Sequence, residues 1–226
     1  MAAYIIYFIA MMLLPIYAQM KVKSAYKKYS QVPADKGMTG AQVARMILDH
    51  HGLYDVRVVP TQGVLSDHYN PATKTVALSE DNFYKNSLAG TAVAAHEVGH
   101  AIQHAEAYSF LTLRAKLVPV ANIAANFSSL PLIIGLIAQS TGFLLLGIVL
   151  LAASVLFQVV TLPVEFDASK RAMNEVVSLG IISNNEERDA KKVLSAAAMT
   201  YVAAAAVAVL ELLRFVLIFL NMNGDD

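Results

Sequence analysis

Two histidines and a glutamate stand close together in the segment TAVAAHEVGHAIQH, which covers residues 91–104. On a helix, His96 and His100 lie on one face, where both imidazoles can reach a single metal ion. Glu97 lies beside them, where its carboxylate can take a proton from a water that the metal activates. Zinc is the metal expected for two imidazoles, and a catalytic zinc site keeps one position open for water. The pattern predicts a metal-assisted hydrolase.

The flanks of this segment indicate a buried helix. Small and apolar residues fill positions 92–95 before the pattern and 101–102 after it. Buried polar and charged groups cost free energy unless something pairs with them. The flanks therefore favour a metal site over histidines that are only hydrogen-bonded. We expect the helix over about residues 88–106, with Gly90 suggesting a break before the metal-binding part.

The composition places this helix in a membrane protein. Hydrophobic residues make up 57% of the 226 residues and charged residues 15%. Residues 1–20 form an uncharged run that is followed, not preceded, by lysines, which is typical of a retained anchor rather than a signal peptide. The uncharged segment 117–164 is too long for one span and predicts a hairpin that turns at 139–142. With a last span in 196–226, we expect about four transmembrane helices.

Two polar segments alternate with these spans. Residues 21–116 are expected to form a metallopeptidase domain, and residues 165–195 a second polar segment that completes the metal site. In the first segment we expect a helix at 40–51, capped by Thr39. We also expect three short strands, at 54–60, 64–68 and 75–78. The predicted fold is a mainly α membrane protein with a small α+β, zincin-like metallopeptidase domain.

The charges predict how the chain crosses the membrane. Of 17 lysines and arginines, 11 fall in 21–116 and 5 in 165–195. The last, Arg214, lies in the final span, where we expect it to pair with Glu211. By the positive-inside rule both polar segments, and with them the active site, face the cytoplasm of a multi-pass cell-membrane protein, while both termini lie outside.

The same counts exclude some functions. The 17 basic residues are balanced by 17 acidic ones, so the chain lacks the excess of positive charge that is typical of nucleic-acid-binding proteins. The chain has no cysteine, so any metal site must use histidine, aspartate or glutamate. Few ionisable residues lie within the spans, which argues against a transporter with a site in the middle of the membrane.

A catalytic zinc ion needs a third protein ligand, and a carboxylate is a common choice beside two histidines. Glu165 opens the second polar segment, in PVEFDASKRA. Its competitors are His104, Glu106 and Asp167. His104 would lie about 6 Å beyond His100 on a straight helix, which suits a supporting or surface role, and Glu106 is farther still. Asp167 stays open as an alternative.

HEVGHAIQH followed by two apolar spans and EFDAS resembles the YugP-like family of bacterial membrane zinc metallopeptidases. It is more distantly similar to the HtpX-like proteases and the CAAX prenyl endopeptidases. The resemblance covers essentially the whole chain. It implies one zinc ion held by His96, His100 and Glu165, with Glu97 as catalytic base. Ser169 departs from the wider group, which has aspartate there, so that a supporting hydrogen bond must come from the serine, from Asp167 or not at all.

Substrate binding is predicted less sharply. His68 and Tyr69 are candidates for stabilising the oxyanion, although two residues in such a loop are more often ordinary turn residues. The strand expected at 75–78 can offer an open edge to an extended protein or peptide substrate, drawn from membrane-associated or misfolded proteins. The sequence leaves open whether the chain forms an oligomer or has a regulatory membrane partner. The alternative is a non-catalytic membrane protein with a structural zinc clamp, using His68 or Asp167 as fourth ligand.

Overall fold

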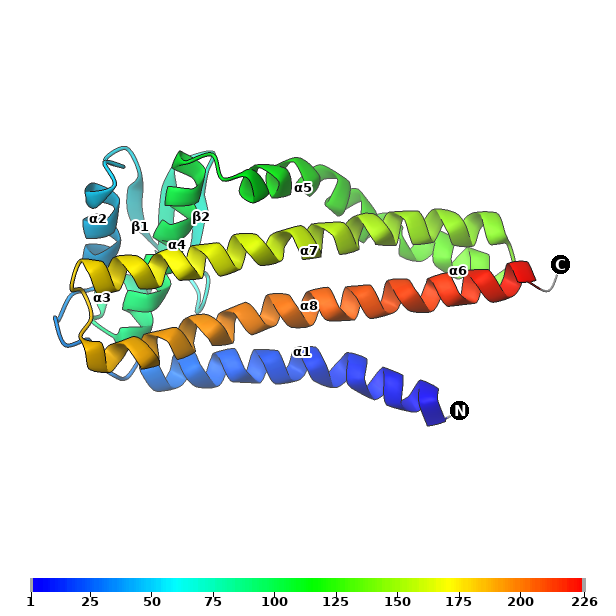
Figure 1. Cartoon of the computed structure of the whole chain (residues 1–226), viewed down its shortest axis with the longest axis horizontal. Helices are drawn as coiled ribbons and strands as arrows, with labels where there is room; N and C mark the ends of the chain where they lie inside the picture. The colour runs from blue at the N-terminus through cyan, green and yellow to red at the C-terminus, as the bar shows by residue number, and fades with distance from the viewer. Residues whose placement is uncertain (1, 225–226) are drawn as a thin grey trace. The chain divides into compact units, whose positions relative to one another are not determined.

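The computed structural model describes residues 2–224, which are mainly helical with one small sheet (Figure 1). This confirms the predicted fold class. The helices are α1 (Ala2–Tyr29), α2 (Gly40–His50), α3 (Glu80–Tyr84), α4 (Leu88–Ala105), α5 (Ser109–Phe127), α6 (Ser129–Ile137), α7 (Thr141–Ser178) and α8 (Asn184–Gly224). The strands are β1 (Arg57–Thr61), β2 (His68–Asn70) and β3 (Thr75–Ser79).

Within the described residues, four helical stretches are long and apolar enough to cross a membrane: Ile5–Tyr29, Ser109–Ile137, Thr141–Ser178 and Asn184–Asn223. The second consists of α5 and α6, which are separated at Ser128. The predicted hairpin turn is present, because α6 ends at Ile137 and Gln139 takes a left-handed conformation with φ 48°. The helices extend well beyond the predicted spans, and the bilayer boundaries within them remain a prediction.

Residue 165 was expected to begin a new helical segment, but it lies inside α7. At about 1.5 Å per residue, Glu165 lies about 36 Å along the helix from Thr141, more than the apolar thickness of about 30 Å. One continuous helix thus carries both the apolar run and the carboxylate. At the start of α8, the Glu186 carboxylate accepts from the Ser183 N–H, and the Ser183 hydroxyl donates to Asp35.

The chain divides into two compact units. The first takes its described residues from Met1–Ile16, Thr112–Pro163 and Tyr201–Asp226, and the second comprises Tyr17–Leu111 and Val164–Thr200. In the first unit a small apolar cluster joins α6, α7 and α8 through Leu132, Leu144, Ile148 and Phe215. Arg214 donates to Glu211 at 2.6 Å, which confirms the predicted pair.

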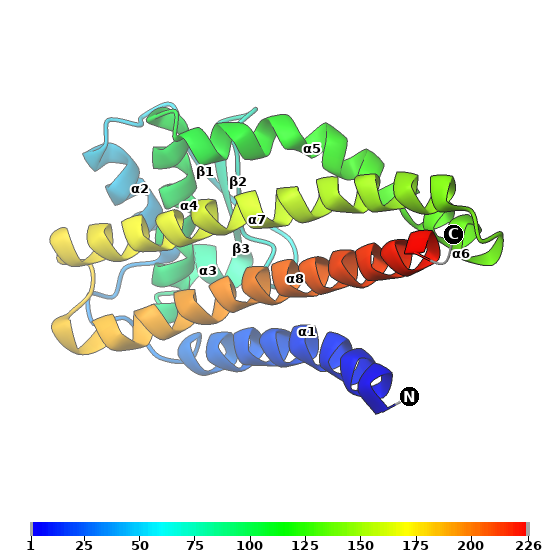
Figure 2. The ribbon, with the colours of Figure 1, turned by 45° about the vertical axis from the view of Figure 1, so that its right-hand side comes forward.

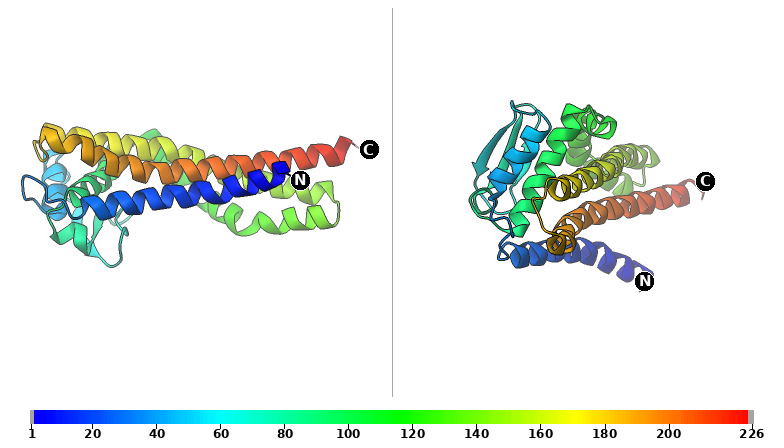
Figure 3. Two further views of the ribbon diagram at one scale, coloured as in Figure 1. Left: turned by 90° about the horizontal axis from the view of Figure 1, so that it is seen from below. Right: turned by 60° about the vertical axis from the view of Figure 1, so that its left-hand side comes forward.

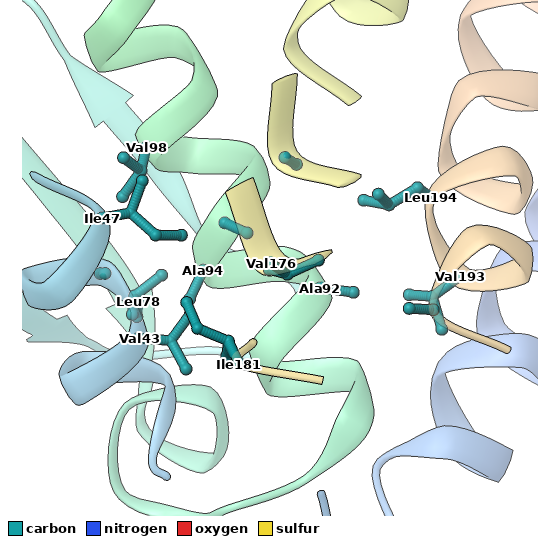
Figure 4. Packing of buried hydrophobic residues seen from close by; sticks show 14 of the residues in the cluster. Val43, Ile47, Leu78, Ala92, Ala94, Val98, Val176, Ile181, Val193 and Leu194 are labelled. Carbon is teal, nitrogen blue, oxygen red and sulfur yellow. The ribbon is translucent and has the colours of Figure 1, made fainter. Parts of the chain in front are cut away.

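The core of the second unit lies around α4. The Thr39 hydroxyl accepts from the Gln42 N–H, and the Gln42 side chain accepts from the Thr39 N–H, so the predicted helix start is confirmed as a full capping box. The apolar face of α2 then packs on α4. Ile47 of α2 and Val98 of α4 are among the fully buried side chains of this core (Figure 4).

The sheet has the order β1-β3-β2, with β1 parallel and β2 antiparallel to β3. Helices α2 and α4 both contact it (Figure 3). The prediction that the strand at 75–78 is an open edge is wrong, because β3 is central and all five of its residues are buried. The edges are β1 and β2, so any strand added to the sheet must pair with one of these.

Two local predictions are also corrected. The strand expected at 64–68 lies at 68–70, because Gly63 and Leu65 take positive φ and the Asp67 carboxylate binds the Ser79 N–H and hydroxyl instead of continuing a strand. Gly90 does not break the metal-binding helix. Ser87 caps α4 by accepting from the Gly90 N–H, and α4 is continuous beyond that point.

Candidate metal centre

The two histidines of the HEVGH pattern lie on consecutive turns of α4, which belongs to the second unit. Figure 2 shows α4 beside the small sheet. The ring centroids of the two histidines are 4.8 Å apart, and their side chains are 14% and 12% exposed. Glu97 lies between the two histidines in the sequence, and it is buried, with 8% of its surface exposed. Ser87 starts the helix and small residues fill its buried face, so α4 can lie deep inside the unit while carrying three polar side chains.

Helix α7 brings Glu165 to the histidines. Val164, Ala168, Ala172 and Val176 recur every four residues and are all buried, which defines the face that α7 turns inward. Glu165 is adjacent to this face and is only 2% exposed. Small residues at the contact, Gly99 on α4 and Ala168 on α7, let the two backbones approach closely.

The three predicted ligands meet at one place. Nε2 of His96 and Nε2 of His100 lie 3.3 Å and 3.6 Å from Oε2 of Glu165. One ligand atom from each residue can be chosen so that all three lie within 4.8 Å of one another, a grouping that can hold a metal ion. Of the other residues considered as third ligand, none belongs to this group within residues 2–224.

The hydrogen bonds around His100 fit a metal ion on its Nε2 atom. The Gln103 amide nitrogen donates to the Val164 carbonyl at 2.8 Å and to Asp167 at 2.9 Å, which fixes the orientation of the amide. Its oxygen therefore faces Nδ1 of His100, 3.0 Å away, and can only accept. This contact places a proton on Nδ1 of His100 and leaves Nε2, 3.6 Å from Oε2 of Glu165, as the atom that can bind a metal ion.

His96 has a weaker support. Its Nδ1 atom lies 3.2 Å from the Ser169 hydroxyl. The bond at this position thus comes from the serine that departs from the wider family pattern, and Asp167 does not replace it. Asp167 instead accepts from Gln103 and from Arg171, whose guanidinium also reaches Glu106 at 2.6 Å. Asp167 is thereby connected to His100 through Gln103. Glu106 contacts Arg171 and is connected to this group only through the arginine.

The remaining candidates lie apart from the three-ligand group. The Tyr69 hydroxyl is 2.8 Å from Nδ1 of His104, which is exposed near the end of α4. Nδ1 of His68, the first residue of β2, is 2.9 Å from the Ser66 carbonyl oxygen in the preceding loop. Burial, followed by the charge of Asp55, raises the pKa of Tyr69, so this phenol stays protonated as a hydrogen-bond donor. The strand β2 that carries both residues contacts α4.

The environment of Glu97 suits a carboxylate that exchanges protons. Burial raises its pKa above the ordinary range for glutamate, and the neighbouring charge of Asp67 acts in the same direction. The two histidines oppose this shift. A raised pKa makes the carboxylate a better proton acceptor than it would be in water.

Sequence reasoning missed Gln103, although it stands within the quoted HEVGHAIQH segment. This side chain is fully buried and connects His100 to two groups on α7, more than 60 residues downstream. A buried glutamine three residues after a candidate ligand, on the same helix face, was the available signal.

Comparison with known proteins agrees with this description. Residues 4–220 match the model of a family described as "Putative neutral zinc metallopeptidase". The chain therefore belongs to this family of zinc metallopeptidases. It is 53% identical over 218 residues to the "Putative membrane protease YugP" of Bacillus subtilis (strain 168), a match that covers 96% of this chain and 97% of that protein. The YugP-like resemblance is thus confirmed, and the chain is a membrane protein. No solved structure matches it.

Proposed function

We propose that this chain is a zinc-dependent endopeptidase of the H-E-x-x-H type that hydrolyses peptide bonds of membrane-associated or misfolded proteins at the membrane surface. The observation that carries the proposal is the grouping of His96, His100 and Glu165, with Glu97 between the histidines in sequence. The family supports zinc, and the name of the Bacillus subtilis relative supports proteolysis in a membrane.

In this proposal His96, His100 and Glu165 hold one zinc ion per chain. Three protein ligands leave the fourth position of a tetrahedral site open, as catalysis requires. Gln103 and Ser169 are positioning residues, because each contacts the Nδ1 atom of a ligand histidine and leaves Nε2 for the metal. When bound, zinc supplies a Lewis acid that activates water and polarises the scissile carbonyl.

Glu97 is the general base in this scheme. Its carboxylate takes a proton from the attacking water as the oxygen forms a bond to the carbonyl carbon. It then passes this proton to the amine that leaves when the carbon–nitrogen bond breaks. A base of this kind contributes about 10²–10⁴-fold to the rate.

The substrate is proposed to lie along β2. This strand is an edge of the sheet, so its outer side offers main-chain groups to an extended peptide. It also carries Tyr69, whose hydroxyl contacts His104 four residues after His100. A protonated Tyr69 is suited to donate a hydrogen bond to a developing oxyanion on a substrate held there.

The active site is proposed to face the cytoplasm, with both termini outside. Of 17 lysines and arginines, 16 fall in the two polar segments, counted as 11 in 21–116 plus 5 in 165–195. This bias is the basis of the orientation. The four long apolar helices support the even number of crossings that puts both termini on one side.

The test is to measure zinc content and casein hydrolysis of the purified full-length protein in detergent. We expect about one zinc ion per wild-type chain, and loss of zinc and activity in His96→Ala and Glu165→Ala. Glu97→Gln replaces the carboxylate with a neutral amide of the same shape. This variant should retain zinc, and its rate of hydrolysis should fall by about 10²–10⁴-fold. His50→Ala, an exposed histidine outside the site, is the matched control and should behave as wild type.

Three results would contradict parts of this scheme. Stoichiometric zinc in Glu165→Ala would move the third ligand elsewhere. Hydrolysis by Glu97→Gln at the wild-type rate would rule out the catalytic role of Glu97. Tightly bound zinc in a wild-type protein that cleaves neither casein nor membrane-protein substrates would favour the structural clamp.

A further inference from the structure

A cationic groove lies between the C-terminal half of α1 and the N-terminal part of α8, which run side by side there (Figure 1, Figure 2). Its volume is about 660 Å³, and all its lining residues belong to the second unit. Five of the lining side chains are cations: Lys21, Lys28, Arg188, Lys191 and Lys192. Among the described residues that line the groove, none is acidic.

The spacing of these residues explains why they share the groove. On α1, Lys21 and Lys28 are seven residues apart, with Ser24 and Ala25 between them at helical intervals. On α8, Arg188 is followed at the same intervals by Lys191, Lys192 and Ser195. Residues three, four and seven apart lie on one face of a helix. The two helices therefore turn one polar, cationic stripe each toward the same groove.

The charge in this groove is only partly compensated. Lys192 donates to Asp189 at 2.7 Å, and Asp189 also accepts from the Tyr29 hydroxyl at 3.1 Å. Lys28 lies over the Tyr29 ring, 4.9 Å from its centroid. All five cations are exposed to solvent. Several like charges in one concave surface attract an anion by their summed potential.

The groove lies where both helices become apolar. Lys21 is the first charged residue after the uncharged run of residues 2–20. On α8, Lys192 is the last charged residue before the uncharged run of residues 193–210. Cations directly beside a membrane-spanning run lie at the level of the lipid headgroups.

We propose that this groove binds the phosphate of an anionic phospholipid, with phosphatidylglycerol-type headgroups as the ligand class. The five cations and the hydroxyls of Ser24 and Ser195 suit phosphate and glycerol oxygens. Ala196 and Met199 line the groove on the side of the apolar run, where acyl chains begin. This apolar side favours a lipid over a free phosphate ion. The site is separate from the proposed hydrolytic centre and does not depend on peptidase activity.

The test uses native mass spectrometry of the full-length protein from mixed micelles containing phosphatidylglycerol or phosphatidylcholine. The wild type should retain phosphatidylglycerol about tenfold more strongly than phosphatidylcholine. Arg188→Gln combined with Lys191→Gln should strongly reduce this preference, whereas Arg188→Lys combined with Lys191→Arg, which keeps both charges, should retain it. The matched control, Lys23→Gln with Lys27→Gln, removes two exposed cations of α1 that do not line the groove and should keep the preference.

Each other outcome overturns the proposal. Equal loss in the groove and control variants would mean a diffuse surface charge. If inorganic phosphate displaces phosphatidylglycerol from the wild type at equal concentration, the site is one for free anions. A wild type without preference for phosphatidylglycerol contradicts the lipid site regardless of how the variants fold.

Discussion

The backbone of Gly99 lies so close to Ala168 that a methyl group on Gly99 would be 2.6 Å from the Ala168 carbonyl oxygen. This contact joins the two helices of the candidate metal centre. Gly99 precedes His100 on α4, and Ala168 follows Glu165 by less than one turn on α7. The distance between the histidines and the carboxylate is therefore set by a contact between backbones.

Gly99→Ala should weaken metal binding. The new methyl group meets backbone atoms, which cannot rotate away, so α4 and α7 must move apart and carry Glu165 from the histidines. We expect about 1–3 kcal/mol of destabilisation and a zinc affinity about tenfold lower or worse. Thermal unfolding and competition with a chromogenic chelator measure the two effects.

Gly142→Ala is the control for this substitution. A Cβ atom there would meet nothing within 4 Å, and the residue lies near the start of α7. Alanine is the better helix former, so stability should be unchanged or slightly higher. Wild-type zinc affinity in Gly99→Ala would show that the helix contact does not determine the ligand distance.

Gln103→Ala tests the support of His100. The substitution removes the acceptor that holds the proton on Nδ1, so the imidazole can rotate or take the other tautomer. We expect zinc affinity to fall by about 10–100-fold. A cobalt-substituted protein should also show an altered visible spectrum, which a purely structural loss elsewhere would not produce. Gln31→Ala, at an exposed position outside the site, should leave both readouts unchanged.

Ser169 offers a test in both directions. Ser169→Ala removes the contact to Nδ1 of His96 and should lower zinc affinity by about tenfold. Ser169→Asp supplies a carboxylate acceptor, which should bind zinc more tightly than Ser169→Ala. Ser178→Ala, an exposed serine near the end of α7, serves as control in the same chelator titration. Equal affinities in the alanine and aspartate variants would remove Ser169 from the site's support.

The pair of Glu211 and Arg214 should act as a unit. Their side chains meet at 2.6 Å, and the Arg214 guanidinium lies 4.5 Å from the centroid of the Phe215 ring. Replacing one partner leaves the other charge in an apolar span, whereas replacing both leaves none. Glu211→Gln should therefore destabilise by about 1 kcal/mol more than the double variant with Arg214→Gln. Unfolding in mixed micelles gives the four free energies of the cycle, and additive effects would contradict the coupling.

Local patterns predicted the local structure well. The metal-binding helix was expected at about 88–106 and runs from Leu88 to Ala105, and the cap at Thr39 is present. Both depend on residues within a few positions of one another. Helical periodicity and side-chain capping act over that range, so the sequence carries them directly.

The errors concern contacts between distant parts of the chain. The strand at 75–79 is central because β1 and β2 pair on both of its sides, which the pattern of one strand cannot show. Gly90 was interpreted as a break, but it lies within a capped helix. A Cβ atom added at this position would lie 3.4 Å from the backbone of Asn82. Gln103 and Gly99 gain their roles from α7, so their own sequence neighbours did not reveal them.

The turn between α6 and α7 has a consequence for how the protein enters the membrane. It spans residues 138–140, which carry no charge. In the proposed orientation, this turn must be carried across the bilayer during synthesis. The lysine-rich segments, and with them the three candidate ligands His96, His100 and Glu165, would stay on the side where the chain is made. In that orientation neither polar segment is transported, so the candidate metal site can assemble in the compartment where the chain is made.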